Sequence, residues 1–342
     1  MTRPALRLIQ IKSPSGERQV VAATGGDASS GGAHIVNGVS STYELAQKAI
    51  AGGASIAATV EALGKGAEVD IPLALAEGRV LCPIDHPDPA HLHVTGTGLT
   101  HLGSAEGRDK MHKKLEGAVQ GEETLTDSMR MFLMGMKDGK PEAGHSGVQP
   151  EWFYKGNGTA LVGSGADLLS PNFAEDGGEE PEMAGIYVIG PDGEPYRLGY
   201  ALANEFSDHV VEKQNYLWLA HSKLRPASLG VEILTGELPR HVEGTSRIWR
   251  GNEVLWEKPF ISGEDNMSHS LDNLEHHHFK YALFRAPGDI HVHCFGTATA
   301  SFADGVKTRD GDVFEITAAP FEYGLTNTLR TRDEEKIEVR ML

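Results

Sequence analysis

The sequence has few cysteines, no long apolar run and a shortage of positive charge. Its 342 residues include only Cys82 and Cys294, too few for a disulfide scaffold and without the spacing of a cysteine zinc site. The start lacks the apolar stretch of a signal peptide, and no run approaches the length of a membrane span. We therefore expect a cytoplasmic protein. The net charge of −17 argues against nucleic acid and acidic membranes as partners.

The remaining sequence divides into a mixed N-terminal part and a β-rich C-terminal part. Alternating residues predict a hairpin from strands at 7–11 and 19–22. Ala and Leu at helical spacing predict short helices at 42–51 and 55–63. Residues 137–149 are rich in Gly, Pro and charge and mark a boundary. Beyond it, extended runs with few crossover helices favour an α+β or sandwich-like fold over a doubly wound one.

Three glutamates are the most informative pattern in the chain. Residues two apart on a strand project from the same face, so Glu180 and Glu182 point the same way if this segment is extended. Asp192-Gly193 accepts the positive φ angles of a two-residue hairpin loop. That loop would place Glu180 directly opposite Glu205.

Opposed carboxylates indicate a metal site, because like charges about 5 Å apart at Cβ destabilise a sheet unless something compensates them. A divalent cation would do so, and a cluster of oxygen ligands suits Mg²⁺ or Mn²⁺. Such an ion would also give an acidic protein local positive charge for an anionic substrate. The alternative is that Glu180 and Glu182 end a solvated acidic loop, and spacing alone does not choose between the two.

Histidines gather in two further places. The run at 276–278 lies mid-chain, and adjacent histidines on a helix point in different directions, so they cannot converge on one ion. We expect a polar surface or a subunit contact there. His91 and His93 would share one face of a strand, but the sequence offers no evident third ligand.

Six segments occur in the order seen in the fumarylacetoacetate hydrolase superfamily. They are PEWFYKGNGTALVGSGADLLSP, EEPEMAGIYVIG, GYALANEFSDHV, SKLRPASLG, APGDIHVHCFGTATA and DGDVFEI. Within that superfamily the chain most resembles the branch of 2-keto-3-deoxy-sugar-acid dehydratases. The likeness covers roughly residues 151–316, and the ordered set is far more specific than any one segment.

The resemblance implies an α+β protein with two domains. Residues 146–342 would form a catalytic domain of mixed β-sandwich and β-roll architecture. Residues 1–145 would form a smaller α+β domain, with a lid segment near residues 95–136. The resemblance also implies a homodimer, with Mg²⁺ or Mn²⁺ as the cofactor and a small α-keto acid as the substrate.

Carried over residue by residue, the resemblance assigns roles to particular side chains. Glu180, Glu182 and Glu205 would bind the metal, although the family usually has Asp at the position of Glu205. Lys223 matches a lysine that reaches the metal-bound substrate. Implied substrate contacts are Lys155 and the Gly-Thr motif formed by Gly296 and Thr297.

The resemblance matches the general acid and the general base of the family less closely. Many relatives carry a histidine and a glutamate one helical turn apart on a mobile segment over the metal. The nearest candidates here are His101 and Glu106, whose spacing differs. His209 follows the strand of Glu205 and either touches substrate or simply begins a helix.

The implied reaction is a dehydration. The metal would chelate an α-keto acid, and loss of a proton from C3 would give an enolate that the metal stabilises. Loss of a C4 hydroxyl as water would then convert a 2-keto-3-deoxypentonate to 2-oxoglutarate semialdehyde. The alternative is hydrolysis of the C3–C4 bond of a 2,4-diketo acid. A second alternative is a sugar-acid binding protein without activity. We favour dehydration because the SKLRPAS segment and the long N-terminal part resemble the sugar-acid branch more than the short acylpyruvate hydrolases.

Overall fold

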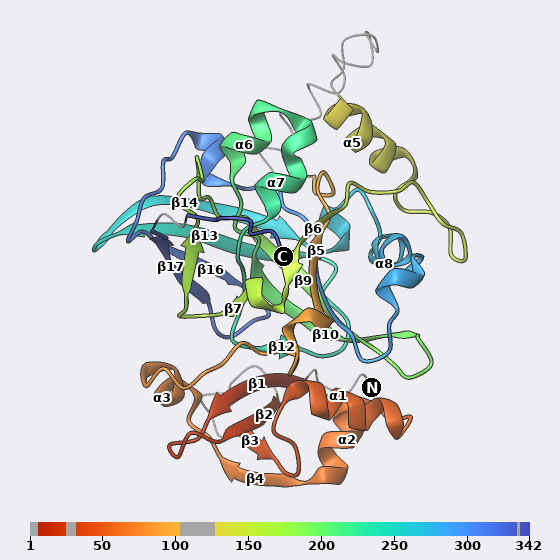
Figure 1. The fold of residues 1–342 in the computed structure, drawn as a ribbon. Helices are drawn as coiled ribbons and strands as arrows, with labels where there is room; N and C mark the ends of the chain where they lie inside the picture. The colour runs from red at the N-terminus through yellow and green to blue at the C-terminus, as the bar shows by residue number, and fades with distance from the viewer. Residues whose placement is uncertain (1–5, 25–31, 103–126, 334–335) are drawn as a thin grey trace.

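Two β-sheets form the framework of the protein (Figure 1). The computed structural model describes residues 6–24, 32–102, 127–333 and 336–342. Within these residues one sheet has 12 strands and the other has five. The strands of the larger sheet are β1 (Leu6–Lys12), β2 (Arg18–Thr24), β3 (Ala33–Val36), β4 (Lys65–Glu68), β5 (Leu92–Gly96), β6 (Phe153–Asn157), β7 (Leu161–Gly163), β9 (Pro181–Ile189), β10 (Pro195–Asn204), β11 (Ala227–Leu229), β12 (Ile233–Leu234) and β15 (Ile290–Cys294).

The smaller sheet and the helices complete the described fold. The strands of the smaller sheet are β8 (Asp167–Ser170), β13 (Val242–Arg250), β14 (Glu253–Ser262), β16 (Val313–Ala318) and β17 (Leu325–Thr331). The α-helices are α1 (Thr42–Ala51), α2 (Ile56–Leu63), α3 (Ile71–Ala76), α5 (Asp127–Asp138), α6 (His209–Gln214), α7 (Leu219–Lys223) and α8 (Leu271–Phe279).

Both sheets mix antiparallel and parallel pairs. The larger sheet runs in the order β4-β3-β2-β1-β12-β10-β9-β15-β5-β6, with β11 beside β10 and β7 beside β11. The smaller runs β14-β13-β16-β17-β8. Parallel pairing joins β15 to β5, β11 to β7 and β17 to β8. The fold is therefore mixed α/β with two sheets, in agreement with the predicted mixture of helices and strands.

Local sequence signals explain the first elements. The predicted hairpin at 7–11 and 19–22 is β1 paired with β2, and the two predicted helices are α1 and α2. Ser41 accepts a hydrogen bond from the N–H of Glu44 at the start of α1, and Ser55 caps α2 in the same way. Figure 1 shows these strands and helices together at one end of the molecule. Their sheet continues into the rest of the chain through the pairing of β1 with β12.

The centre of the larger sheet is buried on both faces. Every residue of β9 is buried, which explains why its sequence is almost continuously apolar. On one face, β9 and β15 share a core with residues of α1 and α2. On the other, Met183, Tyr200 and Leu202 share a core with residues of the smaller sheet and of α8. The β9–β10 hairpin is thus held rigidly from both sides.

Among the described residues, no helix combines the length and apolar character needed to cross a membrane.

Adjacent leucines in β8 offer a matched test of the core beside the hairpin. Leu168 is 0 % exposed and packs in the cluster of Phe206 and Phe314, whereas Leu169 is 41 % exposed. We expect Leu168→Ala to lower the free energy of unfolding by about 2–5 kcal/mol, because it opens a cavity. Leu169→Ala should change it by less than about 1 kcal/mol. Urea unfolding of both variants measures this, and equal losses would contradict the packing described.

Candidate metal centre

The hairpin of β9 and β10 brings Glu180 opposite Glu205, as predicted. The Glu205 N–H donates to the Glu180 carbonyl at 3.0 Å. The path to this register differs from the prediction, because the loop is 191–193, one residue longer, with Gly193 at φ 79°. This displaces the pairing near the turn by one residue. A β-bulge at Leu198 displaces it back, so the two offsets cancel before the glutamates.

Three carboxylates converge at the end of this hairpin. One oxygen from each of Glu180, Glu182 and Glu205 lies within 4.8 Å of the others. The Gly296 N–H donates to Glu182 Oε2 at 2.7 Å. Glu182 Oε1 is buried without a hydrogen-bond partner among the described residues. A buried carboxylate oxygen left unpaired is costly, and a divalent cation would satisfy it. The residues therefore fit a hard ion such as Mg²⁺ or Mn²⁺.

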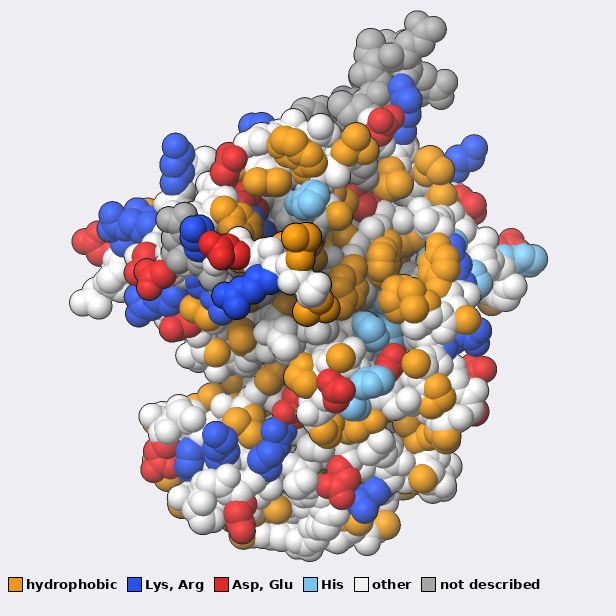
Figure 2. All heavy atoms as spheres, viewed as in Figure 1, with side chains coloured by type: hydrophobic (Ala, Val, Ile, Leu, Met, Phe, Trp, Pro, Cys, Tyr) orange, Lys and Arg blue, Asp and Glu red, His pale blue; other side chains and the backbone are white. Residues whose placement is uncertain are grey.

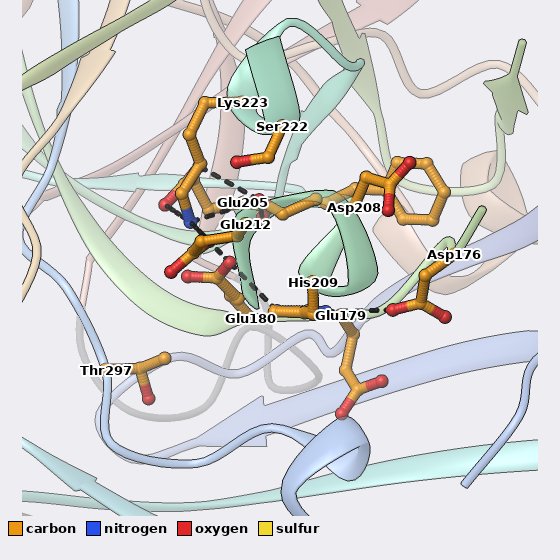
Figure 3. Close-up of polar contacts among 12 residues, drawn as sticks. Asp176, Glu179, Glu180, Glu205, Asp208, His209, Glu212, Ser222, Lys223 and Thr297 are labelled. Atoms are coloured by element: carbon orange, nitrogen blue, oxygen red, sulfur yellow. Dashed lines mark hydrogen bonds and ion pairs between the residues drawn. The ribbon is translucent and has the colours of Figure 1, made fainter. Parts of the chain in front are cut away.

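The loop after β15 supplies the N–H that orients Glu182. Gly296 has φ 96°, and a Cβ there would lie 2.3 Å from Thr100 Oγ1 and 2.8 Å from the Thr97 carbonyl. Only glycine therefore fits. The next residue, Thr297, is half-buried, and its hydroxyl accepts a hydrogen bond from the N–H of Thr299 at 3.2 Å. Figure 3 places Thr297 apart from the dashed network, on the far side of Glu180 from Lys223.

Two buried lysines compensate the carboxylates. Lys223 Nζ lies 2.6 Å from Glu180 Oε1 and 3.4 Å from Glu205 Oε2 (Figure 3). It also donates to Ser207 Oγ at 3.2 Å. Lys155 Nζ lies 3.3 Å from Glu205 Oε1 and donates to the carbonyls of Phe206 and Lys223. An ammonium group has three protons, so these contacts occupy all the donors of Lys155.

Charge is unevenly distributed over the cluster. Burial raises the pKa of Glu182 well above its ordinary value, and the charges of Glu205 and Glu180 raise it further. Burial and the charge of Glu180 also raise the pKa of Glu205, to about 7. Burial opposes ionisation of Glu180 too, but Lys223 and His209 together lower its pKa. Burial disfavours the Lys223 ammonium, yet the surrounding glutamates raise its pKa well above the ordinary value. Lys223 is therefore a fixed cation paired mainly with Glu180.

His209 joins this network from the first turn of α6. Its Nε2 lies 3.1 Å from Glu180 Oε1 and its Nδ1 lies 3.2 Å from Asp176 Oδ2. Burial lowers the pKa of His209, but these two carboxylates outweigh it and raise the pKa to about 10. A Cβ on Gly178 would lie 2.5 Å from His209 Nδ1, so this glycine leaves room for the ring. His209 therefore begins a helix and also holds Glu180, a candidate metal ligand, in place.

The predicted acid and base are not brought together within the described residues. His101 is 3 % exposed, with Nε2 3.1 Å from Ser262 Oγ and Nδ1 3.1 Å from Thr100 Oγ1. Burial lowers the pKa of His101 to about 3, which keeps the ring neutral. Glu106 lies outside the described residues, as do residues 103–126 of the lid segment expected near residues 95–136. The roles of His101 and Glu106 remain predictions.

Sequence reasoning missed two glutamates at the site. Glu179 is 0 % exposed and accepts hydrogen bonds from the N–H and hydroxyl of Ser301 at 2.8 and 2.7 Å. Glu212 Oε2 lies 3.6 Å from Lys223 Nζ, and its side chain is 35 % exposed. The acidic run at 175–182 contains Glu179 but gave no sign of its burial. The alternative that Glu180 and Glu182 end a solvated loop is wrong, because the Glu180 side chain is 12% exposed and Glu182 is 0% exposed. Glu212 lies on the helix that His209 begins, three residues further along.

Solved structures share this fold over nearly the whole chain. A structure named "2-keto-3-deoxy-D-arabinonate dehydratase apo form" matches with a TM-score of 0.67 and 19% identity, covering 96% of this chain and 100% of the other. Another, named as that dehydratase "complexed with magnesium and 2,5-dioxopentanoate", matches with a TM-score of 0.67 and 18% identity over the same shares. A 5-carboxymethyl-2-hydroxymuconate delta-isomerase from Mycobacterium smegmatis matches with a TM-score of 0.56 and 20% identity, again over 96% and 100%.

These likenesses establish that the chain shares the fold of these structures, in agreement with the sequence resemblance to the fumarylacetoacetate hydrolase superfamily. No family model and no curated protein matches the sequence.

The raised pKa of Glu205 predicts how stability depends on pH. Glu205 binds its proton more tightly in the folded protein, where its pKa is about 7, than in the unfolded chain, where it is near 4.5. Its contribution is therefore complete below about 4.5 and is lost as the pH rises through about 7. We expect Glu205→Gln to remove this loss in protein kept metal-free with EDTA.

Urea unfolding at a series of pH values measures the effect. Glu253→Gln, an exposed change in β14, is the matched control and should keep the wild-type pH dependence. Mg²⁺ should stabilise the wild type most at high pH, since metal binding competes with protons. Identical pH dependence in wild type and Glu205→Gln would contradict the electrostatics described.

Proposed function

We propose that this protein is a Mg²⁺- or Mn²⁺-dependent hydro-lyase that dehydrates a 2-keto-3-deoxy sugar acid. The substrate would be a 2-keto-3-deoxypentonate and the product 2-oxoglutarate semialdehyde. The observation that carries the proposal is the buried triad of Glu180, Glu182 and Glu205 beside Lys223, with an unpaired oxygen on Glu182. The shared fold supports it, since one structure with this fold is named as a dehydratase bound to magnesium and 2,5-dioxopentanoate.

The side chains at the site would have different roles in this reaction. Glu180, Glu182 and Glu205 would hold the ion, which would act as a Lewis acid toward the carboxylate and 2-oxo oxygens of the substrate. Lys223, a cation with its Nζ at the rim of the triad, would stabilise negative charge that develops on the substrate. Thr297 has a hydroxyl proton to offer a substrate carboxylate. Dehydration would need a base that removes the proton from C3 and an acid that donates a proton to the C4 hydroxyl, which then leaves as water.

The remaining assignments follow from burial and from the hydrogen bonds already made. The Lys155 side chain is 0% exposed and is held by Glu205 and two backbone carbonyls, whereas the Lys223 side chain is 5% exposed and lies among side chains, so we assign Lys155 to positioning Glu205 rather than to substrate contact. Gly296 likewise uses its N–H on Glu182. Lys223 cannot be the base while its pKa is raised. Glu212, a partly exposed carboxylate beside Lys223 and outside the triad, is the described group suited to accept the C3 proton.

Lys223 gives the sharpest mutational test. We expect Lys223→Gln to lower kcat about 100-fold or more, because a preorganised charge at a developing anion is worth that much. Mg²⁺ affinity, measured by calorimetry, should stay the same or increase, since the variant no longer competes for Glu180. The control is Lys213→Gln, an exposed lysine on the neighbouring helix α6. Full turnover in Lys223→Gln would overturn the assigned role.

Two other reactions would use the same site. Hydrolysis of the C3–C4 bond of a 2,4-diketo acid would need the same bound 2-oxo acid, but it would begin with attack of water on the C4 carbonyl and end with a proton added to C3. Keto–enol isomerisation is supported by two structures of this fold that are named as isomerases. All three reactions, and a binding protein without activity, are distinguished by their products.

The deciding experiment offers purified protein with Mg²⁺ a 2-keto-3-deoxypentonate, a 2,4-diketo acid and a 2-hydroxydienedioate in parallel. We expect 2-oxoglutarate semialdehyde from the first substrate, detected by mass spectrometry, and little change in the others. Glu182→Gln should be inactive while keeping its fold by circular dichroism, because the site loses a ligand. Turnover of only the second or third substrate would replace the proposal with hydrolysis or isomerisation. Binding without turnover of any would favour the non-catalytic alternative.

A further inference from the structure

A second cluster of metal-ligating side chains lies across the sheet from the glutamates. Glu182 shares its face of β9 with Ala184, which pairs with Cys294 of β15. Successive strand residues alternate between faces, so His291 and His293 project from the opposite face. This second cluster is therefore separate from the site of the proposed function.

Three side chains converge there. The parallel pairing of β15 with β5 sets His291 beside His93. One ligand atom from each of His93, Asp289 and His291 lies within 4.8 Å of the others. Asp289 and His291 are 3% and 0% exposed. His93 Nδ1 and His291 Nε2 are buried without hydrogen-bond partners among the described residues. Unpaired buried nitrogens of this kind indicate a missing ligand.

We propose that His93, Asp289 and His291 form a binding site for a divalent transition metal, with Zn²⁺ as the ion that fits best. Two imidazoles and one carboxylate are a donor set that zinc accepts at tetrahedral sites, with the fourth position left for water or another ligand. Imidazole also favours zinc over Mg²⁺, which prefers oxygen. The two faces of the sheet thus offer chemically different sites.

The surroundings are those of a supported metal site. His91 Nδ1 lies 2.7 Å from Asp289 Oδ1, and His93 Nε2 lies 3.2 Å from Asp289 Oδ2, which leaves His93 Nδ1 for the ion. Partners of this kind orient first ligands and tune their basicity. The His93 side chain is 21% exposed, so this edge of the cluster reaches the surface. Figure 2 shows histidine side chains at the surface near the junction between the N-terminal strands and the rest of the molecule.

Trp152 opposes occupation of the site and so provides a test. The indole N–H can only donate, and it donates to His278 Nδ1 at 3.1 Å. His278 must then carry its proton on Nε2 and donate to His291 Nδ1, which leaves the proton of His291 on the unpaired Nε2. A metal at Nε2 requires both rings to change tautomer, and the hydrogen bond from Trp152 is lost. Removing the indole N–H should therefore favour the metal.

The experiment titrates Zn²⁺ into EDTA-treated protein saturated with Mg²⁺, with calorimetry for affinity and elemental analysis for stoichiometry. We expect one Zn²⁺ per chain in the wild type and in Glu182→Gln, which lacks the glutamate site. Asp289→Asn and His93→Gln should bind at least about tenfold more weakly. Trp152→Phe should bind about fivefold more tightly, the equivalent of one hydrogen bond. His241→Gln, an exposed histidine elsewhere, should match the wild type.

A second measurement covers the case in which a buried variant does not fold. Wild-type crystals soaked in Zn²⁺ should show anomalous density between His93, Asp289 and His291. Density at the three glutamates alone would overturn the proposal. So would loss of all Zn²⁺ binding in Glu182→Gln, or wild-type affinity in both Asp289→Asn and His93→Gln.

Discussion

Negative charge buried on the β9–β10 hairpin is the constraint on which the rest of the site depends. Carboxylates in the interior require positive partners, and here each partner comes from a different element. Lys155 comes from β6, His209 from α6 and Lys223 from α7. Lys155 also ties the backbone of Phe206 and Lys223 together. The electrostatic demand of one hairpin thus fixes segments that are distant in sequence around one point.

The central strands present a different set of potential metal ligands on each of their two buried faces. One face presents oxygen donors beside lysines, and the other presents imidazoles beside a single carboxylate. Alternation along β9 and β15 keeps the two sets apart by the thickness of the sheet. Likeness of fold alone does not identify the reaction. The reaction depends on the side chains that face the substrate and not on the order of the strands. The positions of Lys223 and Glu212 carry that information here.

Much of the site was predictable where the signal is local. The turn at Asp192-Gly193 and the spacing of the glutamates predicted their convergence, although through a register with no bulge. Burial of Glu179 was not predictable, because its partner Ser301 lies 122 residues away. The pairing of His93 with His291 likewise depends on a parallel contact between β5 and β15. The hydrophobic pattern of a sequence predicts that such strands are buried, but it does not predict which strands pair with each other.

The histidine run at 276–278 also shows that contacts between distant residues cannot be predicted from local sequence. Helical direction correctly separated the three rings, but the expected polar surface is wrong for His278, which is 1% exposed. Trp152, 126 residues away, supplies the N–H that holds it in the interior. A polar residue inside a helix is read as exposed unless its partner is known. Long-range hydrogen bonds therefore account for most of what sequence reasoning missed.

The bulge at Leu198 gives the hairpin a tolerance to changes in length. The longer turn and the bulge each shift the pairing by one residue, in opposite directions. Only the residues between the turn and the bulge are therefore displaced from the predicted pairing. A relative with a shorter turn and no bulge would present its glutamates in the same alignment. A one-residue change in the length of this turn therefore leaves the ligand geometry constant when a one-residue bulge in β10 compensates for it.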